Sequence, residues 1–384
     1  MRSRSGFLRG ARDGKTEVGE RPGEAAEAVN HAAMPQKNRR RIGKMKKGFG
    51  FRYAVVFTVV TVFFLSTSAL AQEKAMKLRL STIWPTQHPF SQMFGEWGKD
   101  IEKATAGRIT VTVFAANTLS PPMQVYDNTV KGVVDVGTNL LAYSPGRLPL
   151  SEVLQQPLGY RNGYQASKLG NAYYKKFKPK EFDDVKVMFL HGAAPGFIFT
   201  KNPVKSTADV KGLRIKANAE NADIVRNLGA SPVTMPVSET YDALSRGVVD
   251  GCLFPIEALQ GFKIAEVVKT AIENYGMSYM TSMYCVMNKD KWNAISPADQ
   301  KAIEKINDEY NEKFGKKWVE LDNKAKEFAK GKGVTFLPVS KEDEVATAQK
   351  MKPILDEYVK MAKSKGLPGD EALKFCQDFL KNNP

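Results

Sequence analysis

Residues 209–251 read DVKGLRIKANAENADIVRNLGASPVTMPVSETYDALSRGVVDG, and this stretch decides the fold class. Residues 212–216 predict a strand, residues 220–228 a helix, and the spacing of Tyr241 and Leu244 a second, shorter helix before a strand that starts at 248. Strands that alternate with helices in this way predict an α/β domain with a mostly parallel sheet.

The same alternation of strands and helices is predicted before residue 209, in a different amino-acid sequence. Residues 131–135 read KGVVD and residues 246–250 read RGVVD, so one helix–Gly–strand unit occurs twice. This internal echo predicts two similar α/β lobes. Around it we expect strands at 77–81, 108–114, 133–137, 185–190 and 197–200, and helices from Pro89 to Gly107 and over 123–131.

The carboxyl third is predicted to be helical. Ser296 followed by Pro297 is a strong helix start, because Ser caps the first turn and Pro fits there. An apolar stripe continues for four to five turns, about 30 Å, which is long enough to run along two lobes. Its members are Ile303, Ile306, Tyr310, Phe314 and Trp318. Further helices are expected near 354–361 and 371–380, with Pro353 as a kink or a start.

The amino terminus has the pattern of a secretory signal. A basic cluster at 44–47 precedes a short apolar run at 54–65, and residues 69–71 read ALA, a small-x-small cleavage site. We therefore expect a leader at 1–44 that is disordered or non-native, a signal peptide at 45–71 and a periplasmic protein. The alternative is a membrane anchor, although the apolar run is shorter than the roughly 20 residues that span a bilayer.

Charge and cysteine usage narrow the class of partner. Residues 1–71 hold 14 Lys and Arg against 5 Asp and Glu, so the remaining 313 residues have a net charge of +7 rather than the +16 of the whole chain. Beyond the leader no compact basic cluster with interleaved aromatic residues indicates nucleic-acid binding. Cys252, Cys285 and Cys376 form no Cys-x-x-Cys pair, and buried inert thiols are expected.

No motif in the sequence indicates catalysis. There is no Gly-x-Ser-x-Gly, no phosphate-binding Gly-rich loop and no His/Cys cluster with metal spacing. The chain has 3 histidines in all, so we expect neither a His-rich metal site nor a cofactor. A pair of acid–base carboxylates stays possible, since sequence spacing does not exclude one.

Residues 78–330 resemble the extracytoplasmic solute-binding receptors of tripartite ATP-independent periplasmic (TRAP) transporters, the DctP-like family. The matching phrases are IWPTQHP at 83–89, GVVD at 132–135, most of 209–251, and MNKDKW at 287–292. The resemblance implies a two-lobed periplasmic-binding-protein fold, with a hinge of crossing strands and a long helix that spans both lobes. It also implies delivery of a solute to a separate permease, with small and large membrane subunits.

On this resemblance the first lobe comprises 77–196 plus about 286–320, and the second about 197–285 plus 321–384. The family has an Arg at the end of the strand at 212–216, where its guanidinium clamps the carboxylate of the substrate. This chain has Lys216 there, a point charge in place of a planar fork. Arg214 points to the same face and is either a helper or a solvent-facing residue.

Two further departures from the family replace polar anion ligands by apolar side chains. Phe254 stands where an Asn is usual, and residues 196–199, which include Ile198, stand where many members carry a second Arg. The resemblance therefore implies one cation and an apolar wall. The ligand that fits is a small organic acid, a monocarboxylate with an apolar or aromatic part.

The predicted ligand-binding set comes from strand ends and from the hinge-side strands, because open α/β sheets bind ligands at the carboxyl ends of their strands. Lys216 is expected to pair with the carboxylate, and Phe254 and Ile198 to form the apolar wall. The remaining candidates are Trp84, His88 and Tyr143 at the mouth, with His191, Glu239 and Asn218 as secondary members.

Other functions stay open at this point. The chain could be the solute receptor of an ATP-driven or tricarboxylate-type importer or of a sensor system, or an exported hydrolase on a two-lobed scaffold. We expect a monomer that binds a small molecule and is not an enzyme.

Overall fold

The computed structural model describes residues 75–235 and 237–384. The predicted leader and signal peptide lie outside the described residues. Within this part, five strands form one sheet and six form another. The first sheet has the order β2-β1-β3-β10-β4, and its strands are β1 (Met76–Ser81), β2 (Ile109–Phe114), β3 (Val136–Leu140), β4 (Val185–Ala193) and β10 (Thr281–Asn288).

The second sheet has the order β11-β9-β5-β8-β6-β7. Its strands are β5 (Gly196–Thr200), β6 (Arg214–Ala217), β7 (Ser231–Thr234), β8 (Gly251–Pro255), β9 (Thr270–Glu273) and β11 (Thr335–Pro338). Each sheet mixes parallel pairs, such as β1 with β3 and β6 with β8, with antiparallel pairs made by β10 and β5. The expectation of a mostly parallel sheet was therefore too simple.

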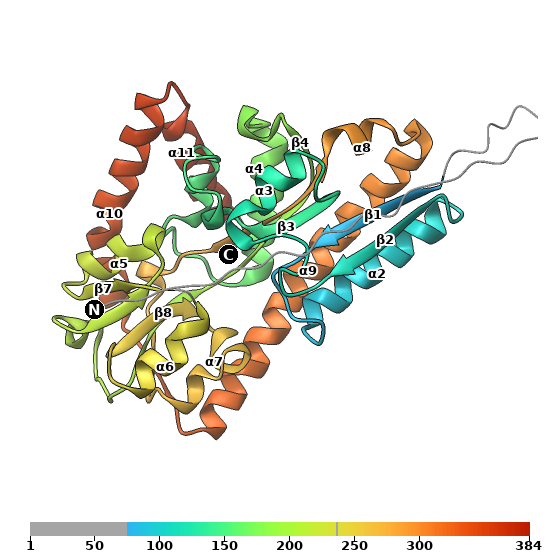
Figure 1. Ribbon diagram of the computed structural model, residues 1–384. Coiled ribbons are helices and arrows are strands. Elements are labelled where there is room, and N and C mark those ends of the chain that lie inside the picture. The colour runs from blue at the N-terminus through green and yellow to red at the C-terminus, as the bar shows by residue number, and fades with distance from the viewer. Residues whose placement is uncertain (1–74, 236) are drawn as a thin grey trace, which may run out of the picture. The chain divides into compact units, whose positions relative to one another are not determined.

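Helices cover both sheets (Figure 1). They are α2 (Pro89–Ala104), α3 (Val125–Val130), α4 (Gly163–Phe177), α5 (Ala222–Asn227), α6 (Thr240–Ser245), α7 (Ala258–Gly261), α8 (Lys289–Asn293), α9 (Pro297–Gly331), α10 (Lys341–Ser364) and α11 (Gly369–Asn382). The apolar spacing predicted for α2 is its buried face, since Phe90, Phe94, Trp97 and Ile101 are all buried. None of the described helices is long and apolar enough to cross a membrane.

Besides the passage along α9 to β11, the chain crosses between the two sheets at two extended segments that the sequence did not locate in detail. β4 of the first sheet runs almost directly into β5 of the second, and β9 of the second leads through residues 274–280 into β10 of the first. Ser278 in the second crossing accepts from Gly159 N–H and donates its hydroxyl to Tyr160 O. These crossings are the feature that the resemblance described as a hinge of crossing strands.

The long helix α9 packs on elements of both sheets, as predicted. Its amino-terminal part contacts α2, α4 and β4, and its later part contacts α7 (Figure 1). The whole predicted stripe is buried, and Ser296 accepts from Asp299 N–H at the helix start. With 35 residues, α9 is about 52 Å long, well beyond the predicted four to five turns.

Several local predictions need correction. β3 starts at Val136 and not at residue 133, because Gly132 makes the turn with a φ of +73° and Val133 is exposed. β9, β10 and β11 were not predicted at all. The first of the two carboxyl-terminal helices starts at Lys341, so Pro353 lies inside α10.

The lobe boundaries stay a prediction. β10 enters the first sheet at Thr281, and α11 packs on α4, which belongs with the first sheet. All three cysteines are free and buried, as expected.

Candidate functional site

Lys216 is a buried charged residue in the middle of the second sheet. β6 lies between β8 and β7, and Lys216 is opposite Cys252 in the register. Its chain neighbours Ile215 and Ala217 pack in the core on one face, whereas Cys252 and Phe254 pack in the core on the other. Because side chains alternate along a strand, Lys216 shares its face with Cys252 and Phe254.

The contacts of the Lys216 ammonium group are an amide and a ring. Nζ donates to Asn218 Oδ1 at 2.8 Å and lies 4.0 Å from the centre of the Phe254 ring. The residue has 0% of its surface exposed, and burial lowers the pKa of the amine to about 8. None of the described carboxylates forms an ion pair with it within 4.0 Å. At neutral pH this is a buried, mostly protonated amine that lacks an anionic partner among the described residues.

Glu220 lies two residues beyond Asn218, just before helix α5. It belongs to the short 3-10 turn Ala219–Asn221 that follows β6. Its carboxylate is hydrogen-bonded by the Asn218 side chain. The residue is exposed to solvent, but the surrounding protein partly desolvates the carboxylate and raises its pKa. The sequence thus places an ammonium group, an amide and a carboxylate in a row over five residues.

Tyr143 from the first sheet lies within electrostatic range of Glu220. It ends the turn Leu141–Tyr143 that follows β3 and packs against the aromatic core of the first sheet. Burial, and secondarily the nearby Glu220 carboxylate, raise the pKa of its hydroxyl. Tyr143 and Glu220 therefore make one link between the two sheets.

His88 makes a second link between the sheets. Its Nδ1 accepts from Phe90 N–H at 3.3 Å at the start of α2, and its Nε2 is 3.5 Å from Glu257 Oε1 of the second sheet's layer. Trp84 stacks on the His88 ring, with centroids 4.2 Å apart. Glu257 N–H in turn donates to Asp322 of α9 at 2.9 Å.

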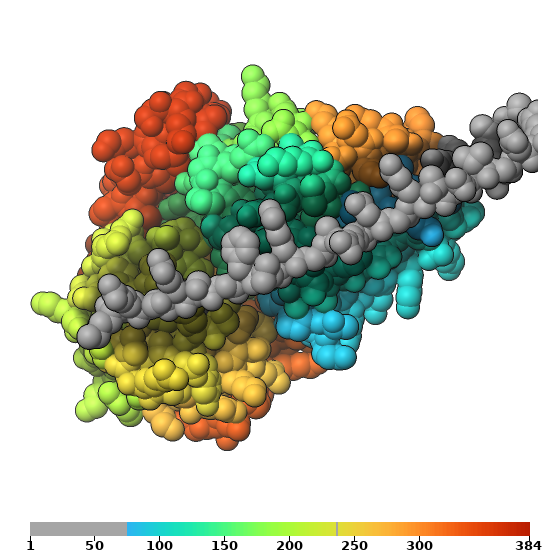
Figure 2. Space-filling model, viewed as in Figure 1, coloured from blue at the N-terminus to red at the C-terminus, as the bar shows by residue number. Residues whose placement is uncertain are grey.

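These residues come from matching ends of neighbouring strands. Trp84 and His88 follow β1, and Tyr143 follows its parallel neighbour β3, whereas Lys216 and Phe254 sit at the ends of the parallel neighbours β6 and β8. The carboxyl ends of two sheets therefore meet, which is where open α/β sheets bind ligands. In Figure 2 the teal and green surface of the first sheet's elements adjoins the olive and yellow surface of the second sheet's elements.

Three predicted site residues are not brought to this place. Ile198 pairs with Leu253 and packs on the opposite face of the second sheet, because it lies one residue out of phase with Phe197, the partner of Phe254. Glu239 is exposed at the start of α6. Arg214, the possible helper, is at the exposed start of β6 and binds Asp250.

After Ile198 and Glu239, His191 is the third member of the predicted set that lies elsewhere, and it is a core residue. Its Nδ1 accepts from Trp318 Nε1 at 3.1 Å, and its ring packs on Phe314 with centroids 4.6 Å apart. Burial lowers its pKa to about 3, so the imidazole is neutral at physiological pH. His191 is therefore a buried residue whose ring nitrogen is hydrogen-bonded within the core.

Sequence reasoning missed Glu220 and Glu257. Each follows the end of a strand that was already singled out: Glu220 is four residues after Lys216, and Glu257 is three residues after Phe254. The signal was present, since polar residues directly after parallel strands line the ligand-binding edge of a sheet. No cluster of three metal-binding side chains occurs within 75–235 or 237–384.

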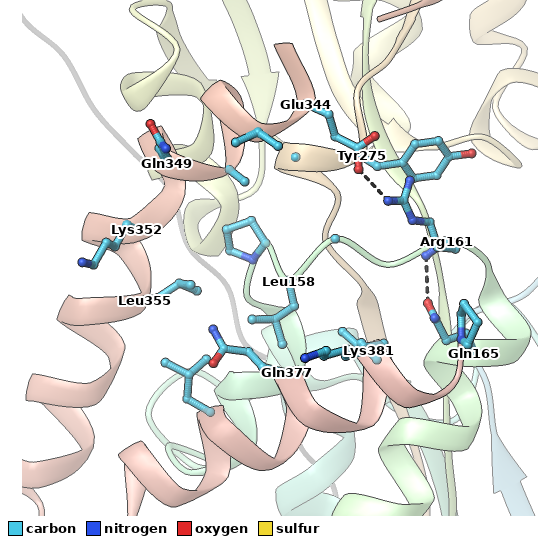
Figure 3. A pocket seen from close by; sticks show the side chains of 18 of the residues that line it. Leu158, Arg161, Gln165, Tyr275, Glu344, Gln349, Lys352, Leu355, Gln377 and Lys381 are labelled. Atoms are coloured by element: carbon cyan, nitrogen blue, oxygen red, sulfur yellow. Dashed lines mark hydrogen bonds and ion pairs between the residues drawn. The ribbon is translucent and has the colours of Figure 1, made fainter. Parts of the chain in front are cut away.

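A groove of about 770 Å³ lies elsewhere, between α10, α11 and the segment 157–161 (Figure 3). Among the charged residues that line it, Arg161 pairs with Glu344 at 2.5 Å and lies 4.4 Å from the centre of the Tyr275 ring, and Lys341 also pairs with Glu344 at 3.2 Å. The lining shares no residue with the set around Lys216. The groove has room for a ligand, but a buried cation without an ion-pair partner among the described residues requires an anion, which favours the strand ends as the ligand site.

Two lobes whose strand ends meet around a buried cation define a two-lobed solute-binding receptor. The model of one family, described as bacterial extracellular solute-binding protein, family 7 (DctP), matches residues 80–361. The chain belongs to this family, which consists of receptors.

Relatives and solved structures agree with this assignment. The chain is 28% identical over 312 residues to "Outer membrane transporter protein TsaT" of Comamonas testosteroni, covering 79% of this chain and 92% of the relative. It is similar to a TRAP periplasmic solute-binding protein of Desulfovibrio salexigens solved as an open complex, at 31% identity and a TM-score of 0.74, over 80% of this chain and 96% of that one.

Two further structures contain aromatic acids. A TRAP solute-binding protein of Rhodoferax ferrireducens with copurified benzoate is 26% identical, with a TM-score of 0.73 over 80% of this chain and 98% of that chain. A TRAP periplasmic solute-binding protein of Bordetella bronchiseptica with bound (R)- and (S)-mandelate is 28% identical, with a TM-score of 0.72 over 80% of this chain and all of that chain. The identification as a TRAP solute-binding receptor with a two-lobed α/β fold is confirmed.

Proposed function

We propose that this receptor binds a small organic monocarboxylate with an aromatic or apolar part, and that the Lys216 ammonium group holds the carboxylate. One observation carries the proposal: Lys216 is fully buried, mostly protonated at neutral pH, and has no ion-pair partner among the described carboxylates. A buried charge is stable only when it is paired and hydrogen-bonded, so an anionic ligand completes this site.

The surroundings of Lys216 favour one carboxylate over two. Phe254 covers the ammonium group with its ring, and Trp84 with His88 supplies an aromatic surface across the interface. Aromatic side chains bury a ligand ring through large apolar contact area. The carboxylates of Glu220 and Glu257 close to the site disfavour a second negative charge on the ligand.

The proposal also covers the export of the protein, its oligomeric state and its membrane partner. The protein is exported through a signal peptide cleaved after Ala71, works in the periplasm as a monomer, and passes its ligand to the small and large membrane subunits of a TRAP permease. It performs no catalysis. In support, the solved structures named above are TRAP solute-binding proteins, and the sequence of residues 45–71 has the form of a signal peptide.

Ligand screening on protein purified from the periplasm tests this proposal. Benzoate, mandelate and phenylacetate should raise the melting temperature, since a ligand at 100 times its Kd adds about 2.7 kcal/mol to the free energy of unfolding. Succinate and glucose serve as the dicarboxylate and the uncharged comparison. Stabilisation by glucose alone, or turnover of any of these compounds, contradicts the proposal.

A further inference from the structure

The row Lys216–Asn218–Glu220 holds two opposite charges that do not neutralise each other directly. Lys216 Nζ and Glu220 form no ion pair within 4.0 Å, although both contact the one Asn218 side chain. Asn218 Oδ1 accepts from the ammonium group at 2.8 Å. One amide thus spaces a cation and an anion at the end of β6.

Glu220 follows the carboxyl end of β6, the edge of the second sheet that meets the first, and it interacts electrostatically with Tyr143 of the first sheet. Its carboxylate therefore belongs to the interface between the lobes. Burial and the Glu220 charge together raise the pKa of the Tyr143 hydroxyl, so that hydroxyl stays protonated and able to donate. Glu220 is exposed to solvent while Lys216 is buried. The cation is therefore the deeper of the two groups, and the anion is the more accessible.

We propose that Glu220 is a specificity-determining residue, which accepts a hydrogen bond from a hydroxyl or ammonium group on the carbon next to the ligand carboxylate while Lys216 holds that carboxylate. This inference rests on the proposed function. A plain carboxylate at Lys216 would meet the Glu220 carboxylate as an unrelieved like charge. A donor on the adjacent carbon changes this contact into a charge-assisted hydrogen bond. The short span of a single amide matches a donor next to the carboxylate better than a donor at the far end of a ring.

The alternative is that Glu220 only repels anions and keeps the site empty until the lobes close. The two views differ in what removal of the carboxylate does. If Glu220 accepts a ligand donor, its removal weakens only ligands that carry one. If Glu220 only repels, its removal tightens every carboxylate by a similar factor.

Calorimetric titration with matched ligands separates them. Mandelate, phenylglycine and phenylacetate share a phenyl ring and a carboxylate, and carry a hydroxyl, an ammonium and no donor on the carbon next to the carboxylate. Lactate and propionate form a second pair without the ring. We expect wild-type protein to bind the better of mandelate and phenylglycine at least tenfold more tightly than phenylacetate, and the same order for lactate over propionate if the small acids bind.

The test variant is Glu220→Met, with Glu220→Gln as the milder change that keeps an acceptor. Glu220→Met should weaken the donor-bearing acid about tenfold or more, whereas phenylacetate should bind equally well or more tightly because its carboxylate no longer meets a like charge, and Glu220→Gln should lie between. Glu102→Met, on the exposed face of α2, is the matched control and should change nothing. Melting curves establish that each variant is folded.

The titrations distinguish failure of the Glu220 proposal from failure of the proposed function. Equal affinity of wild-type protein for the donor-bearing and donor-free acids, or a uniform gain for all acids in Glu220→Met, overturns the role of Glu220 and leaves the carboxylate receptor intact. Failure of every carboxylate to bind wild-type protein overturns the proposed function, and this inference with it.

Discussion

The two helix–Gly–strand units of this protein share one arrangement of an Arg, an Asp and a Gly, which we call the framework. In the first, Asp135 Oδ2 accepts from the Arg79 backbone N–H at 2.8 Å and from its Nε at 2.9 Å. In the second, Asp250 Oδ2 accepts from the Arg214 backbone N–H at 2.9 Å and from its Nε at 3.0 Å. In each case the same Arg also donates to the carbonyl of the glycine that turns the chain, Gly132 or Gly247.

The units differ two residues further along the strand that carries the Arg. In the first sheet this position is Ser81, and in the second it is Lys216. Both are fully buried. The repeated residues hold each strand against its helix, and the position that is not repeated supplies the charge. Arg214, although it is a cation near the predicted site, is engaged with Asp250 in the repeated arrangement, and we expect it not to bind the ligand.

Replacing Lys216 by Met tests this division most strongly. Removing one partner of a desolvated charge pair costs about 2–5 kcal/mol, so binding of an acid ligand should weaken by roughly 30-fold to several-thousand-fold. The free protein should be no less stable, because a buried ammonium group is replaced by an apolar side chain of similar length. Calorimetry and a urea titration measure the two effects separately.

Arg214→Ala is the comparison for this variant. It should lower the free energy of unfolding only slightly, because the lost pair with Asp250 is exposed to solvent, and leave affinity within a few-fold. Near-wild-type affinity in Lys216→Met, or a loss of binding in folded Arg214→Ala as large as in Lys216→Met, contradicts the division between framework and site.

The framework pairs themselves should differ in strength. The Asp135 side chain is 2% exposed and the Asp250 side chain 29% exposed. Asp135→Asn should therefore lower the free energy of unfolding by about 2–4 kcal/mol, against about 1 kcal/mol for Asp250→Asn. Urea denaturation gives both values. Equal losses would show that burial does not set the difference between the two units.

The repeat, the long helix and the position of Lys216 could be predicted from the sequence, because each depends on local spacing or on a motif. The strands β9 and β10 could not, since short apolar runs in this region become strands only through pairing with β5, β3 and β4, which are distant in the chain. The same reason explains Ile198: its type fits an apolar wall, but the register of β5 against β8 decides its face.

Affinity should also depend on pH through Lys216. Burial lowers the pKa of the free amine to about 8, so above pH 8 the unliganded protein loses the proton that carboxylate binding requires. An anion next to the amine raises that pKa again, so binding takes up a proton there, and affinity should fall by up to tenfold per pH unit above pH 8. Calorimetry between pH 7 and 9.5 measures this slope.

Lys216→Arg is the control for the pH profile. Its guanidinium stays charged over the whole range, so affinity in this variant should be flat from pH 7 to 9.5 at whatever value the new geometry gives. A wild-type profile as flat as that of Lys216→Arg would show that the Lys216 amine does not titrate in the site.

The smallest expected effect concerns the two buried bases, one beside each sheet. His191 in the first has a pKa lowered to about 3, from about 6.5 in the unfolded chain. Between these values the unfolded chain binds a proton that the folded protein does not, so stability is lost as the pH falls from about 6.5 towards 3. From pH 7 to 5.5 this single group should remove about 1 kcal/mol of the free energy of unfolding.

His191→Gln keeps an acceptor for Trp318 Nε1 and cannot titrate, so it should be less stable than wild type at pH 7 but lose less on acidification. Urea denaturation at both pH values measures the difference, and an identical acid dependence in the two proteins would show that His191 is not the group that titrates on unfolding. Lys216 has the opposite consequence: its lowered pKa makes the folded protein gain stability as the pH rises from about 8 to 10.5, so the two sheets should respond to pH in separate windows.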